Sequence, residues 1–196
     1  MNRLFRSLAF MIALPLMAPV PALSASLMIA RDAVRAAAQA AFVVERQPTL
    51  APMGQVHLCM NRPAMCLEDA VGSPIVAANA VTLRLLQVVN DDVNGAIVSR
   101  RDEADDWSVA PPAGDCEDYA LTKRVKLIAM GFPAAALRLA VALTPTGETH
   151  AVLVVRTSDG DLVLDNRVAD ILPVPALDLT LVAIQSGRRP DRWFTL

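Results

Sequence analysis

The stretch AGDCEDYALTKRVKLIAMGFP, residues 113–133, decides the fold of this chain. Apolar residues recur at helical spacing after Asp115, and Gly131 and Pro133 supply a stop, so the stretch predicts a helix from about Cys116 to Met130. Asp115 would be the N-cap of this helix. The cysteine therefore lies at a helix N-terminus, where the helix dipole favours a thiolate.

Three carboxylates flank this cysteine, at Asp115, Glu117 and Asp118. Nearby negative charge raises the pKa of a thiol and weakens it as a nucleophile. Acidic residues are also ordinary at a helix start, where they cap the backbone and complement the dipole. Either something offsets these charges or Cys116 is not reactive.

The segments on either side of the stretch set the fold class. Upstream, Val81, Leu85, Val89, Val93 and Ile97 recur every four residues and predict one face of a helix, followed by a charged and proline-rich connection. Downstream, three runs read as strands joined by the hairpin-like turns TPTGE and TSDGD: LRLAVAL (137–143), THAVLVVR (149–156) and LVLD (162–165). The prediction is an α+β domain in which a helix packs on an antiparallel sheet.

Composition limits the classes of partner. The chain has 196 residues, of which 54% are hydrophobic and 19% charged, which suits one well-cored domain and not a disordered chain. The net charge is -2 and no long basic run occurs, so nucleic acid is excluded as a partner class.

The N-terminus has the layout of a secretory signal peptide. Residues 1–26 contain Arg3 and Arg6, then an apolar run from Leu8 to Val20, then small residues at 24–26 where cleavage is expected. An uncleaved membrane anchor is the alternative, although the run is short for a bilayer span and contains prolines. We therefore predict an exported protein with a poorly specified arm at 27–51 and one domain at 52–196.

The three cysteines of an exported chain leave one unpaired. Cys59 and Cys66 flank a turn-like Asn-Arg-Pro and could close a local disulfide, which would leave Cys116 as the free thiol. The alternatives are that Cys59 and Cys66 are small buried hydrophobes, or that a different pair forms.

The second hairpin brings a histidine and an aspartate within reach of each other. A four-residue loop from Thr157 to Gly160 would place Val152 opposite Asp165, and His150 shares the face of Val152, so Asp165 would lie diagonal to His150. A two-residue loop at Thr157 and Ser158 would place them directly opposite, whereas an odd-length loop would put them on opposite faces.

Cysteine, histidine and aspartate in this arrangement are the parts of a nucleophile, a base and an orienting acid. His150 would take the proton of Cys116, and Asp165 would hold the imidazole tautomer. The alternative is that Cys116 is structural, His150 a satisfied strand histidine and Asp165 part of a plain turn.

The blocks GDCEDYALTKR, THAVLVV and LVLDN, in this order and spacing, resemble the bacterial transglutaminase-like cysteine proteinase family, in particular its LapG-type periplasmic proteases. The resemblance extends from about Pro52 to the C-terminus, through APMGQVHLCMNRPAMC, VVNDDVN and QSGRRPDRW. It implies a transglutaminase-like, papain-related fold, a periplasmic location, and a Cys116–His150–Asp165 triad.

The resemblance also implies ligands and partners. Calcium is associated with the acidic residues beside the cysteine, here Asp115 and Glu117, and would neutralise the charges that oppose the thiolate. A protein substrate, in the form of a surface adhesin, and an inner-membrane regulator are implied in the same way. Two other functions stay open on the same fold: amide transfer by the same triad, and calcium-dependent binding without catalysis.

Overall fold

The structure is a computed structural model that describes residues 42–67, 72–101 and 105–196. The predicted signal peptide and residues 27–41 of the predicted arm lie outside the described residues. Within the described part of the chain, none of the helices is both long enough and apolar enough to span a bilayer.

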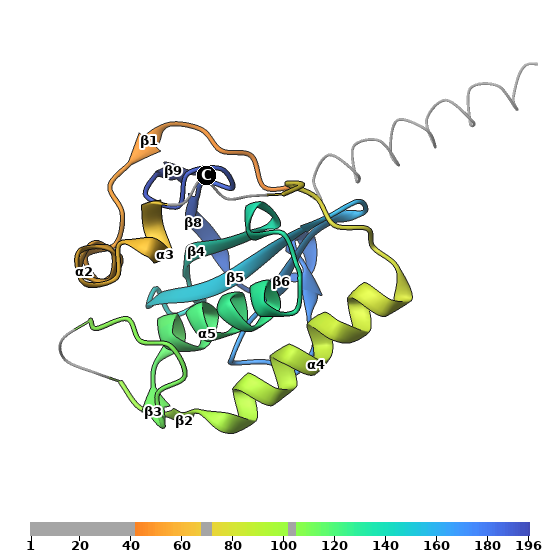
Figure 1. The fold of residues 1–196 in the computed structure, drawn as a ribbon, viewed down its shortest axis with the longest axis horizontal. Helices are drawn as coiled ribbons and strands as arrows, with labels where there is room; N and C mark the ends of the chain where they lie inside the picture. The colour runs from red at the N-terminus through yellow and green to blue at the C-terminus, as the bar shows by residue number, and fades with distance from the viewer. Residues whose placement is uncertain (1–41, 68–71, 102–104) are drawn as a thin grey trace, which may run out of the picture. The chain divides into compact units, whose positions relative to one another are not determined.

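A seven-stranded antiparallel sheet forms the centre of the domain (Figure 1). Its spatial order is β1-β9-β8-β4-β5-β6-β7, so the three predicted strands lie side by side. The strands are β1 (Pro48–Thr49), β4 (Leu137–Leu143), β5 (Thr149–Thr157), β6 (Gly160–Leu164), β7 (Leu172–Pro173), β8 (Thr180–Gln185) and β9 (Trp193–Thr195). The sequence predicted β4, β5 and β6 and missed the others.

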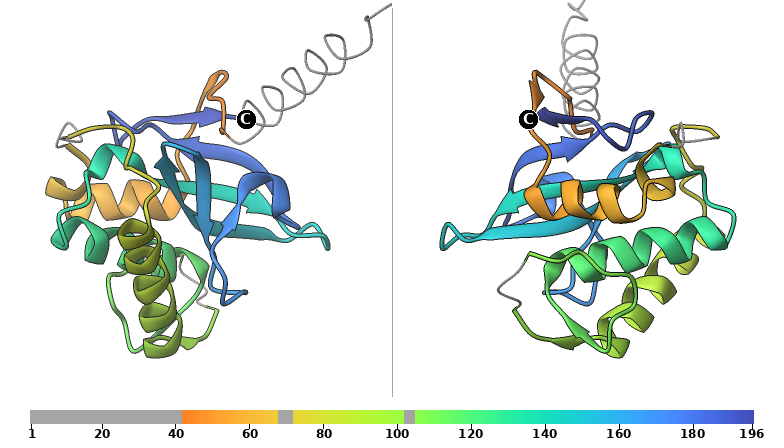
Figure 2. Two further views of the ribbon diagram at one scale, coloured as in Figure 1. Left: turned by 90° about the vertical axis from the view of Figure 1, so that its right-hand side faces the viewer. Right: turned by 60° about the vertical axis from the view of Figure 1, so that its left-hand side comes forward.

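Helix α5 (Cys116–Ala129) packs on β5, and α4 (Ala80–Ala96) packs beside α5, as the views in Figures 1 and 2 show. Two short helices, α2 (Met53–Asn61) and α3 (Ala64–Leu67), precede α4, and two short parallel strands, β2 (Val98–Ser99) and β3 (Ala113–Gly114), lead into α5. Two 3-10 turns, η1 (Ala134–Ala136) and η2 (Val174–Ala176), complete the elements. The mixed helix and antiparallel sheet of the α+β prediction is confirmed.

Both faces of the central strands are buried. Along β5, Leu153 and Val155 belong to the core that contains α4 and α5, whereas Val152 and Val154 belong to a second apolar cluster with Val43. A strand that is buried on both faces reads as a continuous apolar run, which is why THAVLVVR lacks polar alternation.

The apolar face predicted for helix α4 is wrong at the start of the helix. Val89, Val93 and Ile97 are buried as predicted, but Val81 at the start of the helix is 69% exposed. The buried stripe continues through Leu86 and not through the predicted four-residue repeat. An α-helix advances 3.6 residues per turn, so a strict spacing of four drifts away from the packed face over several turns.

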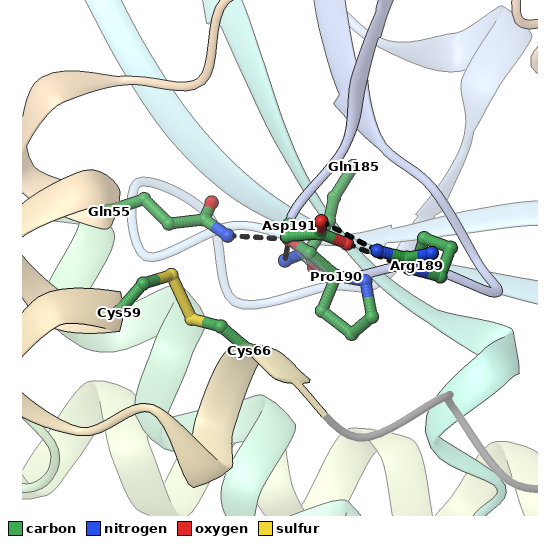
Figure 3. The surroundings of a disulfide bond; sticks show 7 residues. All are labelled: Gln55, Cys59, Cys66, Gln185, Arg189, Pro190 and Asp191. Carbon is green, nitrogen blue, oxygen red and sulfur yellow. Dashed lines mark hydrogen bonds and ion pairs between the residues drawn. A yellow bond between two sulfur atoms is a disulfide. The ribbon is translucent and has the colours of Figure 1, made fainter.

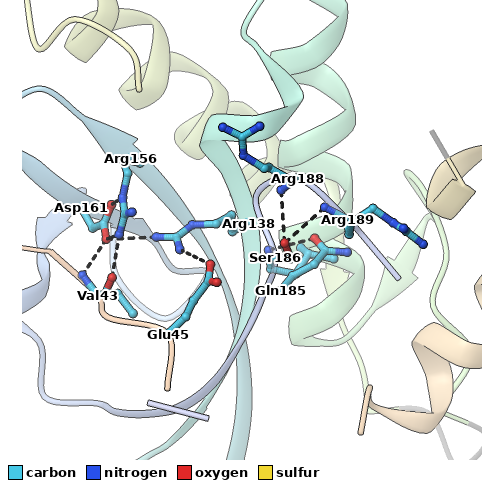
Figure 4. A network of polar contacts seen from close by, with 10 residues as sticks. Val43, Glu45, Arg138, Arg156, Asp161, Gln185, Ser186, Arg188 and Arg189 are labelled. Atoms are coloured by element: carbon cyan, nitrogen blue, oxygen red, sulfur yellow. Dashed lines mark hydrogen bonds and ion pairs between the residues drawn. The ribbon is translucent and has the colours of Figure 1, made fainter. Parts of the chain in front are cut away.

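Residues 43–49, which the sequence placed in the N-terminal arm, join the sheet and its core. Strand β1 pairs with β9, and the Val43 amide donates to Asp161 Oδ2 at 2.7 Å. Two guanidinium groups contact the same carboxylate, from Arg138 at 3.0 Å and Arg156 at 2.9 Å (Figure 4). A buried carboxylate therefore ties the N-terminal segment to β4, β5 and β6.

The disulfide between Cys59 and Cys66 joins α2 to α3 (Figure 3). Beside it, the side-chain amides of Gln55 and Gln185 both donate to the Pro190 carbonyl at 2.7 Å. The hydrogen bond from Gln55 holds α2 against the turn between β8 and β9, and the disulfide fixes α3 to α2. Cys116 is left as the unpaired cysteine.

Candidate active site

Cys116 is the first residue of α5, and Asp115 occupies the N-cap position. The Asp115 side chain makes no capping hydrogen bond, so its carboxylate is not used as the predicted cap. Cys116 is half-buried, and its Sγ lies 3.2 Å from Glu117 Oε2. The thiol thus faces a carboxylate at close range.

Burial is the main reason that this thiol favours its protonated form. Burial, with a smaller contribution from Glu117 and Asp115, raises the pKa of Cys116 to about 12, although a hydrogen bond from the Ala151 backbone amide lowers it. The carboxylates that flank Cys116 therefore oppose formation of its thiolate. Cys116 needs a base or a neighbouring positive charge to become a nucleophile.

The three flanking carboxylates have different surroundings. Burial raises the pKa of Glu117 to about 8, and a hydrogen bond with the Asp115 carboxyl group contributes to the increase. Asp118 points elsewhere: its Oδ1 accepts from the Ser108 amide at 2.7 Å, and a Cβ at Gly114 would lie 1.9 Å from its Oδ2. Asp118 is a structural acceptor that requires glycine at position 114, whereas Asp115 and Glu117 form a carboxyl pair beside the thiol.

His150 and Asp165 meet across the β5–β6 hairpin. Arg156 lies opposite Asp161 and Thr157 opposite Gly160, which is the register of the four-residue loop considered from the sequence. His150 Nε2 and Asp165 Oδ1 are 2.7 Å apart, and both residues are buried. An imidazole held through Nε2 has its Nδ1 available for a second partner.

Two further contacts favour the ionised form of Asp165. Burial alone would raise the pKa of Asp165, but hydrogen bonds from His150 and from the Arg167 amide outweigh it, so that the pKa is lowered. The Arg167 amide donates to Asp165 Oδ1 at 2.9 Å. An ionised Asp165 fixes the orientation of the His150 ring through the Nε2 contact.

The loop after β6 is anchored to α4 by side-chain amides. Asn94 donates to the Asp165 carbonyl at 3.1 Å, and Gln87 and Asn90 both donate to the Ala169 carbonyl at 2.8 Å. The sequence analysis missed these residues. Asn90 and Asn94 are four residues apart and interrupt an otherwise apolar helix face, which was the available signal.

Cys116 and His150 line one cleft of about 810 Å³. Other residues of its wall are Arg101, Asp105, Trp107, Asp115, Glu117, Glu148, Asn166 and Arg167. A cleft of this size accommodates several residues of an extended peptide. The structure brings the sequence-predicted nucleophile, base and acid to one site, and adds Trp107, Asn166 and Arg167, which the sequence analysis did not assign to it.

A family model and solved structures both relate this chain to the same protein family. The model of the bacterial transglutaminase-like cysteine proteinase family matches residues 45–196. A solved structure of LapG from Legionella pneumophila is 27% identical, with a TM-score of 0.50 over 60% of this chain and 71% of that one. The calcium-bound form of Legionella pneumophila LapG is 28% identical, with a TM-score of 0.49 over 55% and 66% of the two chains.

The chain spans about two thirds of the length of these solved relatives. No curated protein matches it. The family model covers most of the chain, including all of α5 and the sheet. The chain therefore belongs to the bacterial transglutaminase-like cysteine proteinases and has the transglutaminase-like, papain-related fold of a cysteine peptidase.

Proposed function

We propose that this chain is an exported cysteine peptidase in which Cys116, His150 and Asp165 form the catalytic triad. The observation that carries the proposal is the 2.7 Å contact between His150 Nε2 and Asp165 Oδ1, in the cleft that Cys116 enters from the start of α5. This contact fixes the imidazole while its Nδ1 remains available to accept the thiol proton.

The proposed reaction follows from these positions. His150 takes the proton of Cys116, and the thiolate attacks the scissile carbonyl carbon of the substrate. The Cys116 backbone amide, at a helix N-terminus, donates to the resulting oxyanion. His150 then gives its proton to the leaving amine, which leaves an acyl-enzyme on Cys116, and water hydrolyses this thioester with His150 as the base.

Calcium binding at Asp115 and Glu117 is part of the proposal. These two carboxyl groups lie close enough to be hydrogen-bonded to each other, and hard oxygen ligands of this kind suit Ca²⁺. Within the described residues no group of three or more histidine, cysteine or acidic side chains forms a ready-made metal cluster, so backbone oxygens and water would complete the coordination. When bound, the ion supplies positive charge beside the thiol.

Glu117→Gln tests the calcium site. We expect calcium titrated into the wild-type protein to release protons to the buffer, because the ion displaces the proton that the Asp115–Glu117 pair holds. The variant should bind at least about tenfold more weakly, since it loses one charged oxygen ligand. Isothermal titration calorimetry in two buffers of different ionisation enthalpy measures both effects.

Glu148→Gln is the matched control, because Glu148 lines the same cleft and is exposed. Equal calcium affinity in the wild type and in Glu117→Gln would exclude this site. Binding that is weakened equally by both substitutions would indicate only a general effect of the acidic cleft.

Amide transfer by the same triad is the alternative chemistry, since an acyl-enzyme can be resolved by an amine in place of water. We expect trapped acyl-enzyme on Cys116 by intact-protein mass spectrometry after brief exposure to a peptide ester. Added putrescine should not compete with hydrolysis when the protein is a peptidase. Quantitative formation of the putrescine adduct would identify a transferase, and absence of any acyl-enzyme would contradict the triad.

The location and the partners extend the same proposal. The layout of residues 1–26 supports export to the periplasm, and the family supports a protein substrate. A surface adhesin as that substrate and an inner-membrane regulator are proposed on the resemblance to LapG-type proteases. Calcium-dependent binding without catalysis is the second candidate, and the observation that favours it is the raised pKa of Cys116.

A further inference from the structure

Helix α2 carries an apolar stripe on its exposed side, formed by Met53, Val56 and Met60. These residues are spaced by three and four positions, so they lie on one face of the helix, and they are 63%, 37% and 76% exposed. Gln55 and Leu58, on the opposite face, are buried. Figures 1 and 2 show α2 at the edge of the molecule. Neighbouring apolar side chains that are exposed together are characteristic of an interaction surface.

A groove of about 290 Å³ lies along the stripe. It is lined by Ala51, Gln55, Val56, Cys59, Met60 and Asp191. The charge of Asp191 is compensated by Arg189, whose guanidinium donates to both carboxylate oxygens at 3.0 and 2.9 Å. The groove is therefore mainly apolar and suits an apolar side chain of a partner.

The stripe begins beside the active-site cleft. Pro52 lines the cleft, Met53 is the next residue, and Ala51 lines the groove. The amide of Gly54 donates at 2.8 Å to the carboxylate of Asp105, which also lines the cleft. A polypeptide bound in the cleft can therefore continue along α2 without leaving the surface of the protein.

Contacts on the buried side of α2 hold the helix in this position. A Cβ at Gly54 would lie 2.3 Å from the ring of Trp107, so the helix packs directly on an aromatic residue of the cleft. Gln55 donates to the Pro190 carbonyl at 2.7 Å, and the disulfide joins α2 to α3 (Figure 3). A surface that is already ordered loses little conformational entropy when a partner binds, which favours docking.

We propose that the apolar stripe of α2 is a docking site for the protein substrate, which binds it through apolar side chains outside the segment held in the cleft. This inference rests on the proposed peptidase, and the continuity between cleft and stripe identifies the occupant. From Met53 to Met60 the helix rises roughly 10 Å, which an extended chain covers with about three residues. Methionine side chains are flexible, so the stripe favours apolar residues without selecting one sequence.

Peptide length separates binding at the stripe from binding in the cleft. Quenched fluorescent peptides of about six residues occupy the cleft, and peptides of about twelve residues also reach the stripe, since an extended chain advances about 3.4 Å per residue. A cleaved core peptide is extended on both sides with either leucine or serine. For the wild type in calcium, we expect the leucine-extended peptide to have a KM about tenfold lower than the serine-extended one, with a similar kcat, because this contact is made equally in the ground and transition states.

The double variant Val56→Gln, Met60→Gln should lose this preference for leucine, because it replaces apolar contact area with polar side chains. Val88→Gln is the matched control, since Val88 is an apolar residue of α4 that is 54% exposed and lines neither the cleft nor the groove. It should keep the preference. Met53→Gln, at the end of the stripe nearest the cleft, is a second variant and should weaken the preference in the same direction if the double variant does not fold.

The same preference for leucine in the wild type and in the folded stripe variants would overturn the inference, as would the absence of any preference in the wild type. Hydrolysis of the core peptide, and its loss in Cys116→Ala, separates these results from failure of the triad. A wild type that cleaves no core peptide would contradict the proposed peptidase and the inference with it. A wild-type dimer in analytical ultracentrifugation that dissociates in the double variant would assign the stripe to a second copy of the chain and would also overturn the inference.

Discussion

Cys116→Ala is expected to abolish peptide hydrolysis, with a fall of about 10⁴-fold or more in kcat. The proposed reaction begins with a bond from the sulfur to the scissile carbonyl, and alanine offers no nucleophile in its place. Hydrolysis of a quenched fluorescent peptide library by the mature protein, in the presence of calcium, measures the loss. Intact-protein mass spectrometry should show at the same time that the acyl-enzyme no longer forms.

The control for this variant is its folding. Cys116 is half-buried and lies outside the disulfide. The free energy of unfolding of Cys116→Ala, measured by urea denaturation, should therefore lie within about 1 kcal/mol of the wild-type value. A correctly folded variant with full hydrolytic activity would show that Cys116 is not the nucleophile.

Asp161→Ala is expected to lower the free energy of unfolding by about 3–5 kcal/mol, the cost of breaking a buried ion pair from one side. Asp161 is 0% exposed, and its carboxylate accepts hydrogen bonds from Arg138, Arg156 and the Val43 amide. Without it, the buried Arg138 guanidinium loses its principal partner, and the N-terminal segment loses its attachment to the sheet (Figure 4). Urea denaturation monitored by circular dichroism measures the change.

Asp159→Ala provides the comparison within the same hairpin, because Asp159 is exposed and contacts the neighbouring Ser158 hydroxyl. Its effect on the free energy of unfolding should be less than about 1 kcal/mol. Equal effects of the two substitutions would mean that the buried network contributes little to stability.

The sequence predicted those parts of the fold that depend on local pattern. The start of α5 at Cys116, the strand from Leu137 to Leu143 and the existence of the β5–β6 hairpin follow from periodicity and turn residues, whereas the structure selects the register of this hairpin from the loop lengths that the sequence left open. These signals are strong because each element repeats its pattern over several residues, and because the hairpin pairs neighbours in sequence.

The parts of the fold that the sequence did not predict depend on pairing between segments that are distant in the chain. Strands β1 and β9 have two and three residues, too few for a period, and they pair across more than 140 residues of sequence. The buried charges are equally invisible in sequence: nothing in the segment ALTKRVKL indicates that Lys123 is buried while Lys126 is exposed. Among the site residues, His150 and Asp165 could be paired through the hairpin, whereas Trp107 and Asn166 are known to line the cleft only from the tertiary structure.

The reactivity of the Cys116 thiol toward iodoacetamide across pH tests the central claim most directly. The experiment uses protein with the Cys59–Cys66 disulfide intact and compares the wild type with His150→Ala, each in calcium and in chelator. We predict that the wild type in calcium forms a thiolate well below the ordinary cysteine pKa of about 8.5, and that chelation and His150→Ala each slow alkylation at neutral pH. A slow thiol that titrates near or above that value, indifferent to calcium and to His150, would contradict the peptidase and favour the non-catalytic binding protein.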